Sequence, residues 1–72
     1  MADTKLLAPM VGKIVSIDVE VGSPVGKNQA VVTMEAMKMK IGVMAPEAGV
    51  VKEIKVSVGQ NVDVETLLAI IG

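Results

Sequence analysis

The sequence predicts an all-β fold, an antiparallel sandwich or flattened barrel with quasi-two-fold symmetry. One observation is an internal repeat that spans most of the chain. Another is a series of short segments with period-2 alternation of apolar and polar residues, punctuated by glycine, which is typical of strands and tight turns. No apolar pattern predicts a helix longer than one turn. Together these features indicate a small β domain built from two similar halves.

The repeat relates residues 8–35 to residues 45–72 at an offset of 37, without gaps. Turn residues match as well as apolar ones, and both glycine and proline restrict or permit particular backbone conformations. Chance is therefore a poor explanation. The identical pairs are Ala8/Ala45, Pro9/Pro46, Gly12/Gly49, Ile17/Ile54, Val19/Val56, Val21/Val58, Gly22/Gly59 and Val25/Val62.

Each copy reads as strand, turn, strand. Alternation of residue types predicts that one set faces the core and the other faces water. In the second copy we expect Lys52 on the inner side, near a sheet edge, with its stem buried and its ammonium in water. The predicted inner sets are Lys13, Val15, Ile17, Val19 and Val21 in the first copy, and Val50, Ile54, Val56 and Val58 in the second.

The turns of the two copies are residues 21–26 and 58–62. Gly22 and Gly59 supply the positive φ that such turns need. The closing strands are predicted over residues 30–34 and 66–71.

Residues 36–44 join the two copies and are expected to cross from one sheet to the other, with the chain ends at the opposite pole. We predict a hairpin whose two loop residues are Met37 and Lys38. Such turns require positive φ and favour Asn-Gly or Asp-Gly, so Met-Lys is a poor choice unless its side chains are needed. The predicted pairs are Ala36 with Met39, Glu35 with Lys40, and Met34 with Ile41.

Composition excludes several functions. The 72 residues predict one domain, 1–72, with no Cys, His or aromatic residue, so a thiol nucleophile, a His-based triad and a zinc finger are excluded and no metal site is expected. A net charge of −1 argues against nucleic-acid binding. No apolar run is long enough to insert into a membrane. The first residues lack the pattern of a secretory signal, so we expect a cytoplasmic location.

The segment Glu35-Ala36-Met37-Lys38-Met39 resembles the attachment motif of biotinyl domains, the biotin carboxyl carrier family, and the resemblance extends over essentially the whole chain. It implies that Lys38 carries biotin through an amide, with Glu35, Ala36, Met37 and Met39 as the rest of the motif. It also implies a barrel-sandwich hybrid of two four-stranded antiparallel sheets, with this lysine on an exposed turn. Residues 19–30 are too few for the protruding "thumb" of some carriers, so the chain is similar to the thumbless type.

The resemblance implies a non-catalytic carrier that shuttles an activated carboxyl group. Its expected partners are biotin protein ligase, biotin carboxylase and a carboxyltransferase or decarboxylase subunit, with the isolated domain monomeric. A membrane-bound decarboxylase complex is one expected parent. Because a free lysine amine has a pKa near 10.4 and only about one in a thousand is neutral near pH 7, the ligase must supply an activated biotinyl-adenylate.

Two other classes remain open. A lipoyl domain has the same fold and a lysine at the same place, but usually has Asp before that lysine and a small residue after it. An unmodified barrel-sandwich interaction module is the other alternative. A self-contained enzyme is disfavoured, because Asp18, Glu20, Glu35 and Glu53 have no recognisable partners at catalytic spacing.

Overall fold

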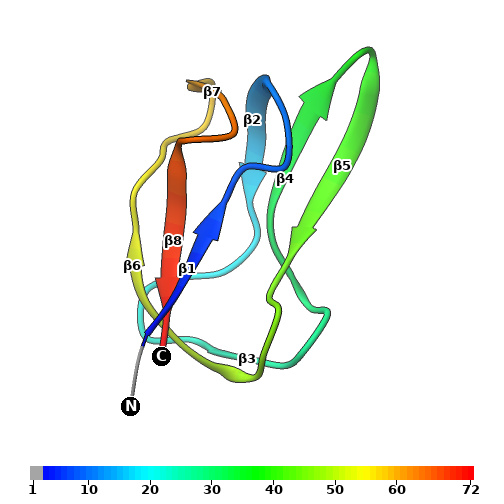
Figure 1. Ribbon diagram of the computed structural model, residues 1–72. Coiled ribbons are helices and arrows are strands. Elements are labelled where there is room, and N and C mark those ends of the chain that lie inside the picture. Colours follow the sequence, from blue (N-terminus) through cyan, green and yellow to red (C-terminus); the bar gives the residue numbers. More distant parts are fainter. Residues whose placement is uncertain (1–2) are drawn as a thin grey trace.

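The computed structural model describes residues 3–72, which form eight strands in two four-stranded antiparallel sheets (Figure 1). The strand orders are β1-β8-β6-β3 and β5-β4-β2-β7. No helix occurs among residues 3–72. The predicted all-β sandwich is therefore confirmed. The strands are β1 (Thr4–Leu7), β2 (Gly12–Ile17), β3 (Pro24–Val25), β4 (Ala30–Ala36), β5 (Met39–Met44), β6 (Gly49–Ile54), β7 (Asn61–Val62) and β8 (Leu67–Ile71).

The two sheets are related by the same offset of 37 that relates the sequence copies. Strands β1, β8, β6 and β3 of one sheet correspond in order to β5, β4, β2 and β7 of the other. Thr4 pairs with Ile71, as Ile41 pairs with Met34. Because β3 pairs with β6 and β7 pairs with β2, each copy lends a short strand to the other copy's sheet. This exchange explains why neither half closes a sheet alone.

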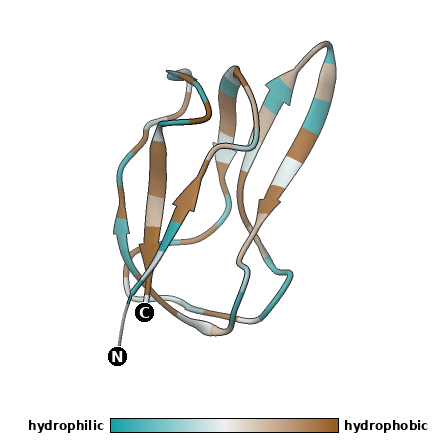
Figure 2. Ribbon diagram, viewed as in Figure 1, coloured by the Kyte–Doolittle hydropathy of each residue, from teal (hydrophilic) through white to brown (hydrophobic). Residues whose placement is uncertain are grey.

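The core lies between the two sheets and is entirely aliphatic. Apolar residues predominate along β8 (Figure 2), and the buried side chains come from both sheets. The largest fully buried side chains are Ile14, Met34, Leu68, Ile71, Val31, Val32 and Val51. Both predicted closing strands supply core residues, and β4 continues two residues beyond its predicted end.

At the start of the first copy, the predicted alternation assigns the inward-facing and outward-facing residues the wrong way round. Ile14 is 1% exposed, whereas Val15, which was expected inside, is 36% exposed. The pairing of β2 with β4 shifts register between Ile14 and Ser16, which is the signature of a β-bulge. After the bulge, Ile17 and Val19 pack against the core as predicted. Lys13 and Val21 are exposed, so they also depart from the prediction.

The second copy repeats this bulge between Val51 and Glu53, 37 residues later. Val51 is therefore buried in place of Val50, while Ile54 and Val56 pack inward as predicted. The remaining predicted inner residue, Val58, is exposed.

The prediction for Lys52 is also wrong. The bulge turns Lys52 outward on β6, which lies between β8 and β3 rather than at an edge. Its side chain is about half exposed, and its Nζ lies 3.3 Å from Asp3 Oδ1.

The crossing between sheets lies later than predicted. Strands β4 and β5 form a hairpin within one sheet, so residues 36–44 do not cross. The chain changes sheet at residues 45–48, where Ala45 is buried and its N–H donates to the carbonyl of Gln29. The two termini lie at the opposite end of the molecule from the β4–β5 turn, as predicted (Figure 1).

Candidate functional site

The candidate site is the turn between β4 and β5. Met37 and Lys38 are its two loop residues. The pairing of β4 with β5 is regular next to the turn, and its register shifts only at the far end, between Ala30 and Val32. The predicted register is confirmed in full. The pairs next to the turn are Ala36 with Met39, Glu35 with Lys40, and Met34 with Ile41.

Both loop residues have left-handed backbone conformations, with φ of 53° at Met37 and 65° at Lys38. Two successive positive φ values characterise the mirror-image turn that matches the twist of a two-residue hairpin. Non-glycine residues carry a free-energy cost in this region. Neither residue is Gly, Asn or Asp, so the turn is formed against local preference, and the pairing of its flanking strands holds it.

The hairpin leaves the sandwich just before the turn. Ala36 is 5% exposed, but Met39 opposite it is 67% exposed, although paired residues share a face of the sheet. Met37 is 85% exposed. Strand β5 lies at the edge of its sheet, so the tip has strand neighbours on one side only.

Lys38 is exposed at this tip. Across residues 3–72, ion pairs join Lys52 to Asp3 and Lys55 to Glu53, and Lys38 takes part in none. No side-chain hydrogen bond holds Lys38 within this part of the chain either. Its amine is therefore open to an approaching enzyme, with no neighbour that must first be displaced.

Glu35 has a lysine on either side across the sheet. It pairs with Lys40 of β5 and with Lys13 of β2. All three residues are exposed on the outer face. Sequence reasoning identified Lys40 but missed Lys13, because the bulge in β2 hides that register from simple counting. Lys13, Glu35 and Lys40 thus form a row across the sheet beside the β4–β5 turn, with the carboxylate between two positive charges.

The five residues of the predicted motif therefore do not share one environment. Glu35, Met37, Lys38 and Met39 are exposed near the tip, whereas Ala36 is buried beneath it. Ala36 therefore acts as the base of the hairpin, and the other four are available to a partner.

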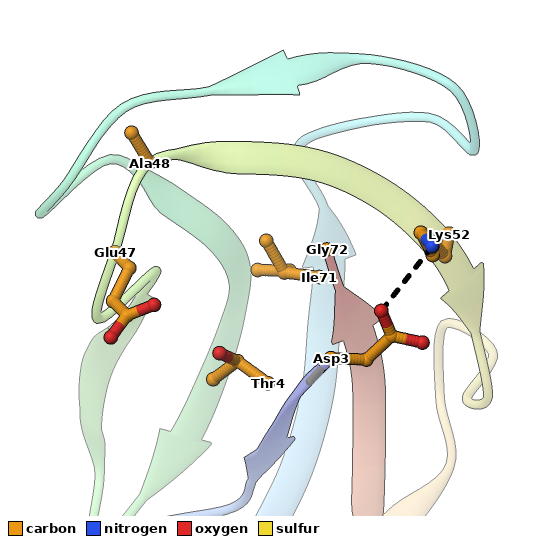
Figure 3. Close-up of a pocket in the computed structure, with 7 residues that line it drawn as sticks. All are labelled: Asp3, Thr4, Glu47, Ala48, Lys52, Ile71 and Gly72. Atoms are coloured by element: carbon orange, nitrogen blue, oxygen red, sulfur yellow. Dashed lines mark ion pairs between the residues drawn. The ribbon is translucent and has the colours of Figure 1, made fainter. Parts of the chain in front are cut away.

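A pocket lies beside Asp3 and Gly72, away from the β4–β5 turn, and Figure 3 shows the residues that line it. Its wall includes Glu47 and the ion pair of Asp3 with Lys52. No group of three metal-ligating side chains occurs in the described residues. Residues 3–72 contain no helix long and apolar enough to span a membrane. The exposed turn that contains Lys38 is therefore the strongest candidate for a functional site.

A family model described as biotin-requiring enzyme matches residues 4–71. The chain is 46% identical over 63 residues to the propionyl-CoA carboxylase alpha chain of Ruegeria pomeroyi, covering 88% of this chain and 9% of that protein. It is 38% identical over 64 residues to a biotinylated protein of Mycobacterium leprae, covering 89% of this chain and 90% of that protein.

The chain is also 43% identical over 58 residues to the dihydrolipoyllysine-residue acetyltransferase component of the pyruvate dehydrogenase complex of Cupriavidus necator, covering 81% of this chain and 10% of that protein. The structure resembles the urea carboxylase of Kluyveromyces lactis with a TM-score of 0.94 and 28% identity, covering 100% of this chain and 6% of that one. The chain thus spans about a tenth or less of the length of several large relatives.

Proposed function

Because this chain belongs to the biotin-requiring enzyme family, we propose that it is a biotin carboxyl carrier with biotin attached through an amide to Lys38. The observation that carries the proposal is the exposed Lys38 at a two-residue turn with positive φ at both positions. In a chain with seven glycines, two long side chains at such a turn indicate a use for those side chains.

The residues around Lys38 fit a covalent group of this kind. Its amine has no hydrogen bond or ion pair to the rest of residues 3–72, and Met37 beside it is exposed. A ligase could therefore present an activated carboxyl carbon to the neutral Lys38 Nζ. The N–C amide bond would form, the C–O bond to adenylate would break, and the lysine nitrogen would lose one proton. When attached, biotin supplies a ureido nitrogen that can carry a carboxyl group.

The chain's own contribution is presentation. The paired strands β4 and β5 hold the turn away from the core, so only the lysine side chain and its attached arm must search for a partner. Tethering of this kind raises the local concentration of the carried group to the mM range for short linkers. The domain is proposed to be non-catalytic, because its exposed carboxylates lack a built acid–base site.

The proposed partners follow from the larger relatives. Biotin protein ligase would load Lys38, a biotin carboxylase would add the carboxyl group, and a carboxyltransferase or decarboxylase would remove it. The pole that holds the chain ends is far from the turn (Figure 1), so a covalent or docked parent enzyme need not block the loaded arm. We propose a cytoplasmic location on the absence of cysteine.

The proposal is tested by incubating the purified chain with biotin protein ligase, ATP and biotin, and measuring intact mass. Lys38→Arg should abolish labelling, whereas Lys40→Arg, the matched control within the same hairpin, should retain most of it. Lys40 belongs to β5 and pairs with Glu35, so its amine leaves from a strand rather than from the turn. Label that persists in Lys38→Arg would overturn the assignment.

The second candidate function is a lipoyl carrier, because the chain is also similar to a dihydrolipoyllysine-residue acetyltransferase component. A parallel incubation with lipoyl ligase and lipoate separates the two. The biotin proposal predicts a mass shift with the biotin ligase and none with the lipoyl ligase, since methionines flank Lys38 on both sides.

A further inference from the structure

We propose that Gly12 is a positioning residue for the attachment turn, because it lets β2 approach β4 closely enough to set the direction in which Lys38 is presented. The inference deepens the proposed function and rests on it. Gly12 begins β2, and the next residue, Lys13, pairs with Glu35 of β4. It therefore lies beside the last residues of the strand that leads into the turn.

Space, not backbone conformation, requires glycine here. The φ of Gly12 is outside the left-handed region, so its backbone conformation is open to other residues. A Cβ built on Gly12, however, would lie 2.5 Å from the carbonyl oxygen of Glu35 and 2.5 Å from Met34 Cε. Cβ atoms do not approach other atoms this closely. Met34 Cε ends a flexible side chain and can turn aside, but the Glu35 oxygen belongs to the main chain. A side chain at position 12 must therefore change the spacing of β2 and β4 at Glu35.

Such a displacement is transmitted to the turn between β4 and β5, because the turn has few other packing contacts. Glu35 lies three residues before Lys38. Beyond Ala36, the side chains of Met37 and Met39 are exposed, and β5 is an edge strand. The direction of the tip is thus fixed at the base of the hairpin, where Gly12 allows the close contact.

The repeat supplies a matched control at the other end of the molecule. Gly49 lies 37 residues after Gly12, and its Cβ would lie 3.0 Å from the carbonyl oxygen of Gly72 and 3.0 Å from Ile71 Cγ2. Gly72 and Ile71 are the counterparts of Glu35 and Met34 at the same offset. Gly49→Ala therefore crowds the corresponding strand pair, with a smaller overlap than at Gly12, without touching the β4–β5 hairpin.

The experiment compares the full chain with Gly12→Ala and Gly49→Ala. Circular dichroism first establishes that both variants are folded, and trimethylamine N-oxide is added to all samples if either is partly unfolded. The kcat/KM of biotin protein ligase is then measured with each as substrate. Because a misplacement of about 1 Å can cost about a hundredfold in rate, we expect Gly12→Ala to lose about tenfold or more and Gly49→Ala to stay within about twofold of the parent chain.

A second measurement reports the position of the hairpin directly. The methyl NMR signals of Met37 and Met39 should shift in Gly12→Ala and stay in place in Gly49→Ala. Equal losses of kcat/KM in both variants, or unchanged methyl signals in Gly12→Ala, would overturn the positioning role. If the parent chain takes no biotin, the proposed function fails instead, and the methyl signals still decide whether Gly12 directs the hairpin.

Discussion

Met37 and Lys38 have left-handed backbone conformations that most side chains avoid. The same conformation occurs at Gly22 and Gly59, where glycine adopts it at little cost. Asn28 also has a positive φ, of 69°, but Asn tolerates this conformation better than Met or Lys does. The chain thus uses glycine or asparagine where a turn serves only to reverse direction, and long side chains where the proposed attachment occurs. The sequence itself shows this contrast when Met37 and Lys38 are taken as the two loop residues.

A substitution at Met37 tests whether the turn is strained. Asn tolerates positive φ better than Met, and Met37 is 85% exposed, so little apolar burial is lost. Met37→Asn should therefore raise the free energy of unfolding by about 0.5–1 kcal/mol. Urea unfolding measures the gain as a higher midpoint concentration, provided that the dependence of the free energy of unfolding on urea is unchanged. A midpoint at or below that of the parent chain would show that the turn is not strained.

At the scale of elements, two bulges decide which side chains enter the core. Alternation alone placed Val15 and Val50 inside, but the register shifts in β2 and β6 put Ile14 and Val51 there instead. An extra residue in one strand changes no residue type, so the pattern carries no direct signal of it. The recurrence of the bulge at the same offset indicates that it belongs to the repeat unit.

The corrected phase can be tested with two conservative substitutions in β2. Ile14→Val removes one methylene from the core and should cost about 0.5–1.5 kcal/mol in the free energy of unfolding. Val15→Thr, on the exposed side, should change it by less than about 0.5 kcal/mol. Chemical denaturation of both variants measures the difference. A larger cost at Val15 than at Ile14 would restore the phase predicted from alternation.

At the scale of the whole molecule, the quasi-two-fold relation fixes where the hairpin and the chain ends lie. Applying the offset to the pairing of β4 with β5 gives the pairing of β8 with β1, which has no connecting turn. The start of β1 and the end of β8 therefore occupy the position that corresponds to the β4–β5 turn. The repeat predicted this arrangement, whereas the exact crossing at residues 45–48 depends on tertiary pairing that the sequence does not display.

The symmetry predicts equal responses at its two glycine turns. Gly22 and Gly59 have φ of 92° and 91°, and a Cβ at either position would meet nothing within 4 Å. Gly22→Ala and Gly59→Ala should each lower the free energy of unfolding by about 1–2 kcal/mol, and the two costs should agree within about 0.5 kcal/mol. Thermal or urea unfolding measures both. A cost confined to one turn would show that the two halves differ in their energetics.

The account depends most on a covalent group at one lysine. The direct measurement is peptide mapping by tandem mass spectrometry of the chain after incubation with biotin protein ligase. We expect a single biotinyl group, on the fragment that contains Lys38 and on that residue within it. Biotin found on any of the other lysines, or an unlabelled Lys38 under conditions that label a known carrier, would contradict it.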